Sequence, residues 1–432
     1  MRRPIGPALR LLLASSLLAV GVAAAAAAHP SGSGTWVGRF WPGPSPDGSM
    51  PLPQLMTWAA SSVSWAFSGS NITVVIDGSL ASLPPAHQTR AAVAGAAAAA
   101  ALPWCSFQFV LDGQASVAVT RPAAPVLTWT RQLAPGKHTL TITKINQAAG
   151  GSAWLQSVAV GGGTFLPPPQ SPGQASGRRM LFMGDSYTAG SGSAGNSSCT
   201  NLAFENEDAL RTYAMATARH FDADAQLLAW AGAGLNVPVR RQASGRLFTA
   251  AEREIVSPLM AELFSRADAL TASTQANLQS FIPQIVVLAA GTNDFRGVKI
   301  GTESHHLEGE DLAEVVPIDA WLDKWEAYVR QIRAAYPGAA IITLVWPFEQ
   351  QLAGVQGPFK TPAYLQYMAA AHTRLHMAGI QNTHLLQIVG ESFNSIQNWC
   401  YRHPDAATHA KVAEQLIRFI TAVFPAWAGA AA

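Results

Sequence analysis

The chain has 432 residues, 49% of them hydrophobic and 12% charged, which is enough to bury a large core and to form two domains. With 28 basic and 26 acidic residues, its formal net charge is only +2. It has no basic patch and no interleaving of basic with aromatic residues, so the sequence gives no support to nucleic-acid binding.

Residues 1–28 are predicted to be a secretory signal peptide. Arg2 and Arg3 precede the apolar run LLLASSLLAVGV, and the alanines before His29 are small enough for cleavage. An uncleaved signal anchor is the alternative, because residues 11–28 approach the length that spans a membrane. The second half of this run is alanine, which is only weakly apolar and favours cleavage. We therefore expect a secreted mature chain with 25 basic and 26 acidic residues and no transmembrane segment after cleavage.

Residues 29–165 are predicted to form an all-β domain. Short β-branched and aromatic runs, separated by Gly, Asp, Asn and Pro turns, lie at 63–79, 107–120, 126–133, 137–145 and 154–162. Strands at this regular spacing indicate a β-sandwich of the jelly-roll type. The alanine-rich run 91–101 has little to bury and is interpreted as a low-complexity insertion in a loop.

Residues 166–177, LPPPQSPGQASG, are rich in Pro, Gly and Ser and are predicted to be a linker. Strands and helices alternate after it, so residues 178–432 are predicted to form an α/β domain with a parallel sheet covered on both faces. Buried strands are expected within 179–186, 225–232, 283–294 and 339–348, and helices within 207–221, 317–338 and 409–424. Ligands bind at the carboxyl ends of such strands, where three polar motifs follow.

The first polar motif is GDSY, in which Ser186 follows the strand MLFM through Gly184 and Asp185. A serine there can direct its hydroxyl and its own N–H into a cleft, as a nucleophile requires. The alternative is an ordinary turn, since Gly, Asp and Ser are common turn residues. The motif does not have the G-x-S-x-G spacing of an α/β-hydrolase elbow.

The next two strands end in WAGAGLN and GTNDF. A glycine in the first lets a backbone N–H approach a substrate oxygen, although a tight turn explains it as well. In the second, Asn293 can donate its side-chain amide to a developing oxyanion, or it caps a helix or forms an Asx turn.

Histidines at the end of the chain provide a candidate base. His403 and His409 precede the last helix, and a neutral imidazole is the ordinary base for activating a hydroxyl. His409 enters the helix and is expected to cap or pack. The histidines are not at a metal-ligand spacing, and the pair His305 and His306 is interpreted as a polar loop, so neither a metal nor a cofactor is expected.

Together, GDSY, the glycine of AGAG, GTND and RHP resemble blocks one, two, three and five of the SGNH hydrolases, serine esterases on a three-layer flavodoxin-like fold. The resemblance implies that Ser186 is the nucleophile and His403 the base. It also implies an oxyanion hole built from the N–H of Ser186, Gly232 and Asn293. Gly232 is preferred to Gly234 because it aligns with the family glycine.

The first domain and the Pro-rich linker are similar to the N-terminal jelly roll that precedes the SGNH domain in the second carbohydrate-esterase family. Members of that family are carbohydrate O-deacetylases that act on acetylated xylan, mannan and related sugars. The resemblance therefore implies a serine esterase that acts on acetylated polysaccharide or oligosaccharide without a cofactor or metal. Asp294, next to Asn293, and Asp185, next to Ser186, are expected to support the site.

One position departs from the family pattern. The usual block has Asp three residues before the histidine, and this chain has Cys400 there, with Tyr401 and Arg402 between. Some members manage with a Ser-His dyad, whereas removal of a triad acid can cost about 10⁴ in rate. Glu391 and Asp405 are possible substitutes.

The three cysteines of the chain fit an oxidising compartment. If the loops after Ser186 and before His403 rim one cleft, a disulfide between Cys199 and Cys400 would tie them together and help fix the imidazole. Cys105 would then be a buried free thiol.

The sequence thus predicts a secreted carbohydrate O-acetyl esterase that works through a Ser186–His403 dyad and an acyl-enzyme. Two alternatives remain open. One is an esterase for a lipid or aryl acyl ester, because the fold hosts many substrates. The other is a weakened glycan-binding protein, because the acid is missing.

Overall fold

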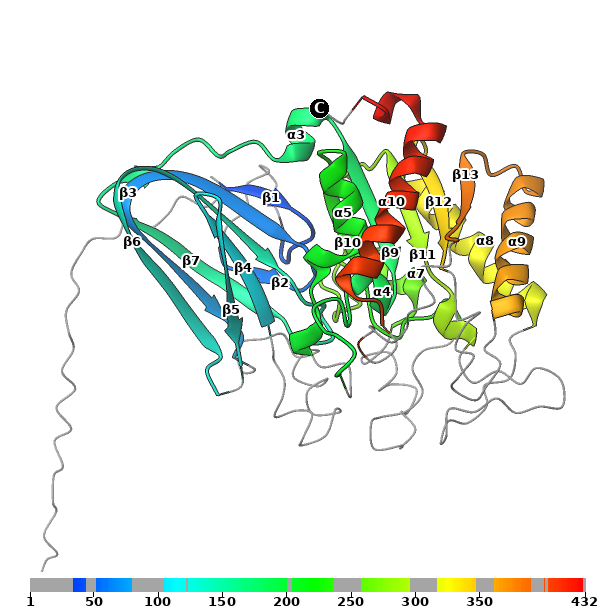
Figure 1. Cartoon of the computed structure of the whole chain (residues 1–432), viewed down its shortest axis with the longest axis horizontal. Helices are drawn as coiled ribbons and strands as arrows, with labels where there is room; N and C mark the ends of the chain where they lie inside the picture. Colours follow the sequence, from blue (N-terminus) through cyan, green and yellow to red (C-terminus); the bar gives the residue numbers. More distant parts are fainter. Residues whose placement is uncertain are drawn as a thin grey trace, which may run out of the picture.

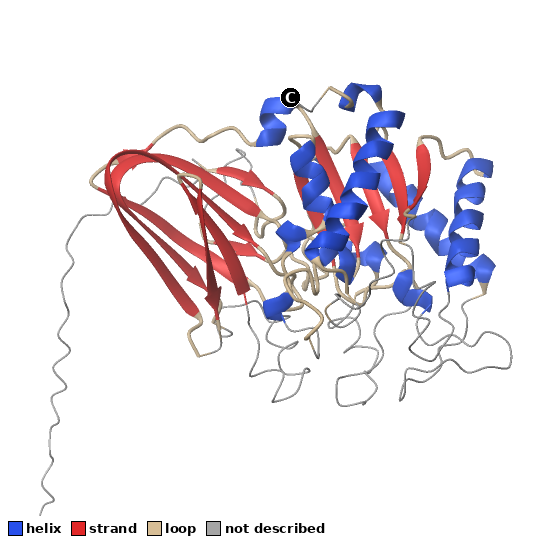
Figure 2. Cartoon of the chain, viewed as in Figure 1, coloured by secondary structure: helices blue, strands red, loops and turns tan. Residues whose placement is uncertain are grey.

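The computed structural model describes residues 34–43, 52–79, 105–121, 123–199, 204–236, 258–295, 317–346, 361–389, 400 and 403–429. Within them the chain forms an antiparallel β-domain followed by an α/β-domain, which confirms the predicted fold class (Figures 1 and 2). The predicted leader, the alanine-rich run, the histidine pair 305–306, Glu391, Tyr401 and Arg402 lie outside the described residues.

The N-terminal sheet is antiparallel throughout, in the order β2-β7-β3-β6-β4-β5, with β1 and β8 also paired to β3. Its strands are β1 (Thr35–Val37), β2 (Gln54–Met56), β3 (Ser62–Asp77), β4 (Cys105–Leu111), β5 (Gln114–Thr120), β6 (Val126–Lys144), β7 (Ala153–Gly161) and β8 (Thr164–Phe165). The separately predicted strands 126–133 and 137–145 are one strand, because β6 stays paired with β3 on both sides of a register shift.

The register shift of β3 lies between Gly69 and Asn71. A bulge at this point changes which face each alternate side chain points to. Odd-numbered side chains are buried before it and even-numbered ones after it, so both halves of the strand enter the same core. These side chains are Val63, Trp65 and Phe67, then Ile72, Val74 and Ile76.

The C-terminal sheet is parallel, in the order β10-β9-β11-β12-β13. Its strands are β9 (Arg179–Gly184), β10 (Asp224–Ala229), β11 (Ile285–Ala289), β12 (Ala340–Val345) and β13 (Thr383–Gln387). The first four were predicted and the edge strand β13 was not.

Helices cover both faces of the parallel sheet and complete three layers (Figure 1). The α-helices are α3 (Pro172–Ser176), α4 (Ser186–Ala189), α5 (Tyr213–His220), α7 (Met260–Leu263), α8 (Ile318–Ala335), α9 (Thr361–Met377) and α10 (Ala406–Val423). Short 3₁₀ turns are η2 (Phe204–Asn206), η3 (Ala209–Arg211), η4 (Leu278–Ser280), η5 (Thr292–Phe295) and η8 (Pro425–Trp427). None of the described helices combines the length and apolar character needed to cross a membrane.

Alternate side chains of the strand β9 pack into two different cores, one on each face of the sheet. Met180 and Phe182 pack in the core under α5 and α10, whereas Leu181 and Met183 pack in the core under α8 and α9. A strand that is buried on both faces has consecutive apolar residues in its sequence, and MLFM is such a run.

Two helical predictions differ from the structure. The segment 207–221 was predicted as one helix, but it forms the turn η3 and the separate helix α5. Asp208 caps η3 and Thr212 caps α5, because each side chain accepts a hydrogen bond from a backbone N–H. The segment 166–177 contains the short helix α3, which Ser171 caps through a reciprocal bond pattern with Gln174.

Buried hydrogen bonds join the two domains. Arg39 donates to the carbonyls of Phe264 and Arg266, at 2.5 and 3.1 Å, and the Trp58 indole donates to Ala267 O at 2.8 Å. Closer to the carboxyl edge of the parallel sheet, Ala209 N donates to Ile145 O at 2.9 Å. The segment after β6 is therefore anchored beside the loops that follow the central strands.

Candidate active site

Three adjacent strands bring the predicted site residues to one edge of the sheet. Gly184 ends β9 and is paired with Ala229 of β10 and with Ala289 of β11. Ser186, Gly232 and Asn293 follow these strand ends within a few residues. The register therefore places the motifs GDSY, AGAG and GTND side by side.

Ser186 is the first residue of α4 and is only 4% exposed. Asp185 caps this helix, and its carboxylate accepts a hydrogen bond from Tyr187 N at 3.0 Å. Ser186 Oγ lies 2.8 Å from His403 Nε2. The hydroxyl is thus within reach of a base, which is the arrangement that nucleophilic catalysis requires.

His403 is held by its backbone and by an aromatic neighbour. Its backbone N–H donates to Cys400 O at 2.9 Å, and its imidazole makes a T-shaped contact with the Tyr187 ring at a centroid distance of 5.1 Å. Gly192 leaves room for it, because a Cβ there would lie 2.7 Å from the Cβ of His403. The loop after Ser186 is therefore packed directly against His403.

A disulfide joins Cys199 to Cys400, with a Cα–Cα distance of 4.9 Å across 201 residues of sequence. It links the loop after Ser186 to the residue whose carbonyl accepts from His403 N. Cys105 is buried and free, as predicted. Asp405, a possible substitute for the missing acid, caps α10 by accepting from Thr408 N at 2.8 Å.

Two backbone N–H groups are available at this edge. Gly232 has a φ of +83° in a turn closed by a 3.0 Å bond from Ala233 N to Trp230 O, a conformation that favours glycine. Among the described residues, neither the N–H of Ser186 nor that of Gly232 has a hydrogen-bond acceptor. Both can therefore donate to a substrate oxygen.

The amide of Asn293 is already engaged. Its Nδ2 donates to Asp185 Oδ2 at 3.2 Å and to Ala233 O at 3.0 Å. Thr292 Oγ1 donates to the same oxygen of Asp185. Because an amide nitrogen has two hydrogens, Asn293 can donate to an oxyanion only by giving up one of these bonds.

Asp294 binds the neighbouring loop. Its carboxylate accepts from Leu235 N at 3.0 Å and from Asn236 N at 2.8 Å, and it accepts from the Trp321 indole at 3.0 Å. These bonds attach the segment that follows Gly232 to the helix α8.

Sequence reasoning missed two polar residues beside this site, Gln147 and Glu207. The Gln147 side chain donates to Glu207 Oε2 at 2.9 Å and accepts from Ala231 N at 2.6 Å. The only sequence signal is the polar pair Asn146–Gln147 directly after a predicted strand, and nothing in the spacing links it to residues in the second domain.

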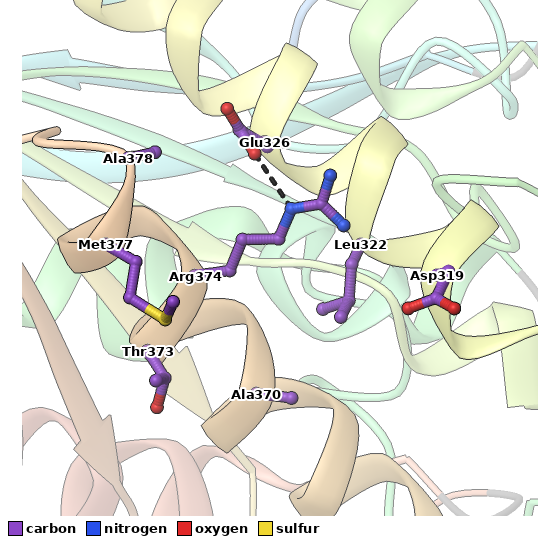
Figure 3. Close-up of a pocket in the computed structure, with 8 residues that line it drawn as sticks. All are labelled: Asp319, Leu322, Glu326, Ala370, Thr373, Arg374, Met377 and Ala378. Carbon is purple, nitrogen blue, oxygen red and sulfur yellow. Dashed lines mark hydrogen bonds and ion pairs between the residues drawn. The ribbon is translucent and has the colours of Figure 1, made fainter.

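A pocket elsewhere in the molecule lies between α8 and α9 and shares no residue with this site (Figure 3). Its Arg374 is bound to Glu326 Oε2 at 2.9 Å and to Asp323. Within the described ranges, no group of three or more His, Cys, Asp and Glu side chains is placed to hold a metal ion.

His409, the second candidate base, is fully buried in α10 and accepts a hydrogen bond from Tyr213 N at 3.3 Å through Nδ1. It stacks on the Tyr213 ring. Burial lowers its pKa to about 3, so the folded protein holds a neutral imidazole. It packs, as predicted.

The stability of the protein is expected to fall in acid because of His409. An unfolded histidine titrates near pH 6.5, so the neutral buried form stabilises the fold fully above that pH, and this stability is lost as pH falls toward 3. Denaturant unfolding should show that the free energy of unfolding of wild type falls between pH 7.0 and pH 4.5. This loss should be smaller by about 3 kcal/mol in His409→Gln, which keeps an acceptor but does not titrate. An equal loss in both proteins would contradict this assignment.

Residues 182–411 match the model of the GDSL-like lipase/acylhydrolase family, and residues 47–169 match the N-terminal domain of carbohydrate esterase family 2. The chain is 29% identical over 193 residues to the cellulase/esterase CelE of Acetivibrio thermocellus, covering 44% of this chain and 21% of that protein. It is 28% identical over 196 residues to an acetylxylan esterase/glucomannan deacetylase of Cellvibrio japonicus, covering 44% of this chain and 48% of that protein. The chain therefore spans less than two thirds of either relative.

A solved structure of a family two carbohydrate esterase from Clostridium thermocellum, in complex with cellohexaose, has the same fold. It superposes with a TM-score of 0.65 at 22% identity, covering 91% of this chain and 99% of that one. The family match covers more than half of the chain and includes both Ser186 and His403. The chain therefore belongs to the GDSL-like lipase/acylhydrolase family.

Proposed function

We propose that this protein is a secreted carbohydrate O-acetyl esterase that deacetylates a xylan- or mannan-type polysaccharide. The observation that carries the proposal is the 2.8 Å contact between Ser186 Oγ and His403 Nε2, beside the two available N–H groups of Ser186 and Gly232. The match to the family 2 N-terminal domain and the names of the two relatives support a carbohydrate ester as the substrate.

In the proposed mechanism, Ser186 Oγ attacks the acetyl carbonyl carbon while His403 Nε2 accepts the hydroxyl proton. The N–H groups of Ser186 and Gly232 donate to the resulting oxyanion, and Asn293 joins them by exchanging its bond to Ala233 O. When the tetrahedral intermediate collapses, the sugar oxygen leaves with the proton from His403. Water, activated by the same imidazole, then attacks the acetyl-serine ester and releases acetate.

We propose that the surrounding chain, in which Cys400 stands where the family has its triad aspartate, limits the movement of His403. The backbone N–H of His403 is bonded to Cys400 O, the Cys199–Cys400 disulfide ties its loop to the loop after Ser186, and the Tyr187 ring contacts its imidazole. Asp185 supports Ser186 and Asn293 together, because its carboxylate caps α4 and accepts from the Asn293 amide. Asp294 holds the loop that follows Gly232.

The proposal is tested by acetate release from acetylated xylan and acetylated glucomannan, with Ser186→Ala as the blank. Aryl acetate and a long-chain aryl ester are assayed in parallel. We expect release from at least one polysaccharide and a preference for the acetate over the long-chain ester. Faster hydrolysis of the long-chain ester, with neither polysaccharide deacetylated, would instead favour a lipid or aryl ester as the substrate.

A further inference from the structure

Gln147 belongs to the N-terminal domain, yet its side chain lies among the loops of the esterase site. It follows β6 and is 2% exposed. Its Oε1 accepts from Ala231 N at 2.6 Å, and its Nε2 donates to Glu207 Oε2 at 2.9 Å and to Ser191 Oγ at 3.3 Å. Its own backbone N–H donates to Glu207 Oε1. The amide thus bonds to three separate segments of the second domain.

Two of these segments carry the available N–H groups. Ala231 directly precedes Gly232, and the turn around it is closed by the Ala233 N to Trp230 O bond. Ser191 N donates to Ser186 O at 2.9 Å, so Ser191 is bonded to the carbonyl of the residue that carries the other N–H. A single side chain is therefore connected to both parts of the oxyanion site.

The orientation of the Gln147 amide is determined by its partners. Ala231 N–H can only donate, so the amide oxygen must face it, and the amide nitrogen then faces the Glu207 carboxylate. Glu207 is 5% exposed, and the nearby Lys144 is fully buried and donates to Asn146. Burial of this much polar surface is costly unless every group is bonded, so the arrangement resists displacement of the glutamine.

We propose that Gln147 is a positioning residue for the esterase reaction, which holds the turn of Gly232 so that its N–H points at the oxyanion. The proposal rests on the proposed roles of Ser186 and Gly232. It makes the N-terminal domain part of the catalytic apparatus rather than only a packing or carbohydrate-contacting unit.

The first test replaces Gln147 by methionine, which keeps the length of the side chain and removes its hydrogen bonds. Because removal of one oxyanion donor costs about 10²- to 10³-fold in kcat, displacement of one should lower kcat on aryl acetate by about 10- to 100-fold. KM should stay within about threefold, because the lost bond acts on the transition state and not on the bound ester.

Gln226→Met is the matched control. Gln226 is also a buried glutamine that joins the two domains, since it donates to Gly38 O at 3.1 Å and accepts from Arg39 Nε at 3.3 Å. Its loss should lower the melting temperature, as should the loss of Gln147, while kcat stays within about threefold of wild type.

A second variant separates positioning from a general effect on folding. Gln147→Glu alone brings two carboxylates together and should lower kcat. In the double variant with Glu207→Gln, the carboxylate at position 147 can accept from Ala231 N and from the new amide at position 207. The kcat of the double variant should therefore be at least about tenfold higher than that of Gln147→Glu.

The outcomes are distinct. A folded Gln147→Met with wild-type kcat, or a kcat loss no larger than that of Gln226→Met, overturns the role of Gln147, as does a double variant with no recovery. If wild type is active and Ser186→Ala is not, the proposed function stands in each of these cases. If wild type cleaves no ester, both proposals fail.

Discussion

Ser186→Ala is expected to lower kcat by about 10⁴- to 10⁶-fold, the range found when a serine nucleophile is removed. The hydroxyl lies 2.8 Å from His403 Nε2 and is the group that forms the acyl-enzyme in the proposed mechanism. Initial rates on aryl acetate and on acetylated xylan measure the effect. Mass spectrometry of quenched enzyme should find an acetyl adduct in wild type and none in the variant.

Ser193→Ala is the control, since Ser193 is a buried serine of the same loop whose hydroxyl is bonded to two backbone carbonyls. Its hydroxyl donates to Gly190 O at 2.8 Å and to Asp208 O at 2.7 Å, so its loss should lower stability and leave kcat within about threefold. If Ser186→Ala retained more than about a tenth of the wild-type rate, Ser186 would not be the nucleophile. If wild type bound polysaccharide but neither protein released acetate, a binding role would be favoured.

Much of the α/β domain could be predicted because its signals are local. Each of β9, β10, β11 and β12 is a buried run, and parallel strands align their carboxyl ends. The strands β10, β9 and β11 lie side by side in the sheet, so the motifs that follow them meet although they are far apart in sequence.

The strand β13 and the helix α9 were missed for different reasons. The edge strand β13 is short and only partly buried, so no continuous apolar run marks it. The helix α9 does have buried residues at helical spacing, Tyr364, Met368, Ala371 and Leu375, and this periodicity was available in the sequence.

The contacts within the site were the least predictable part. Gln147 and Glu207 lie 60 residues apart in different domains, and their bond depends on how the domains pack. The sequence also gave no reason to expect that Asp185 and Ala233 O would occupy the amide of Asn293. Long-range polar contacts of this kind follow from tertiary packing, because a polar residue has no sequence period that identifies its partner.

His403→Gln is expected to lower kcat by about 10⁴-fold or more, although glutamine can still form a hydrogen bond to the Ser186 hydroxyl. A side-chain amide cannot accept the proton that the hydroxyl loses during attack, so the bond alone does not activate the nucleophile. The measurement is kcat on aryl acetate, with far-UV circular dichroism and thermal unfolding to show that the variant is folded.

His409→Gln is the matched histidine control, because it makes the same substitution six residues away at a side chain that bonds to Tyr213 N. It should keep kcat within about threefold at pH 7. If His403→Gln kept kcat within about tenfold of wild type, the imidazole would only position the hydroxyl, and another group would have to act as the base. Loss in His403→Gln alone would show that the imidazole works as a base although Cys400 replaces the family aspartate, because the disulfide and Tyr187 are unchanged in both variants.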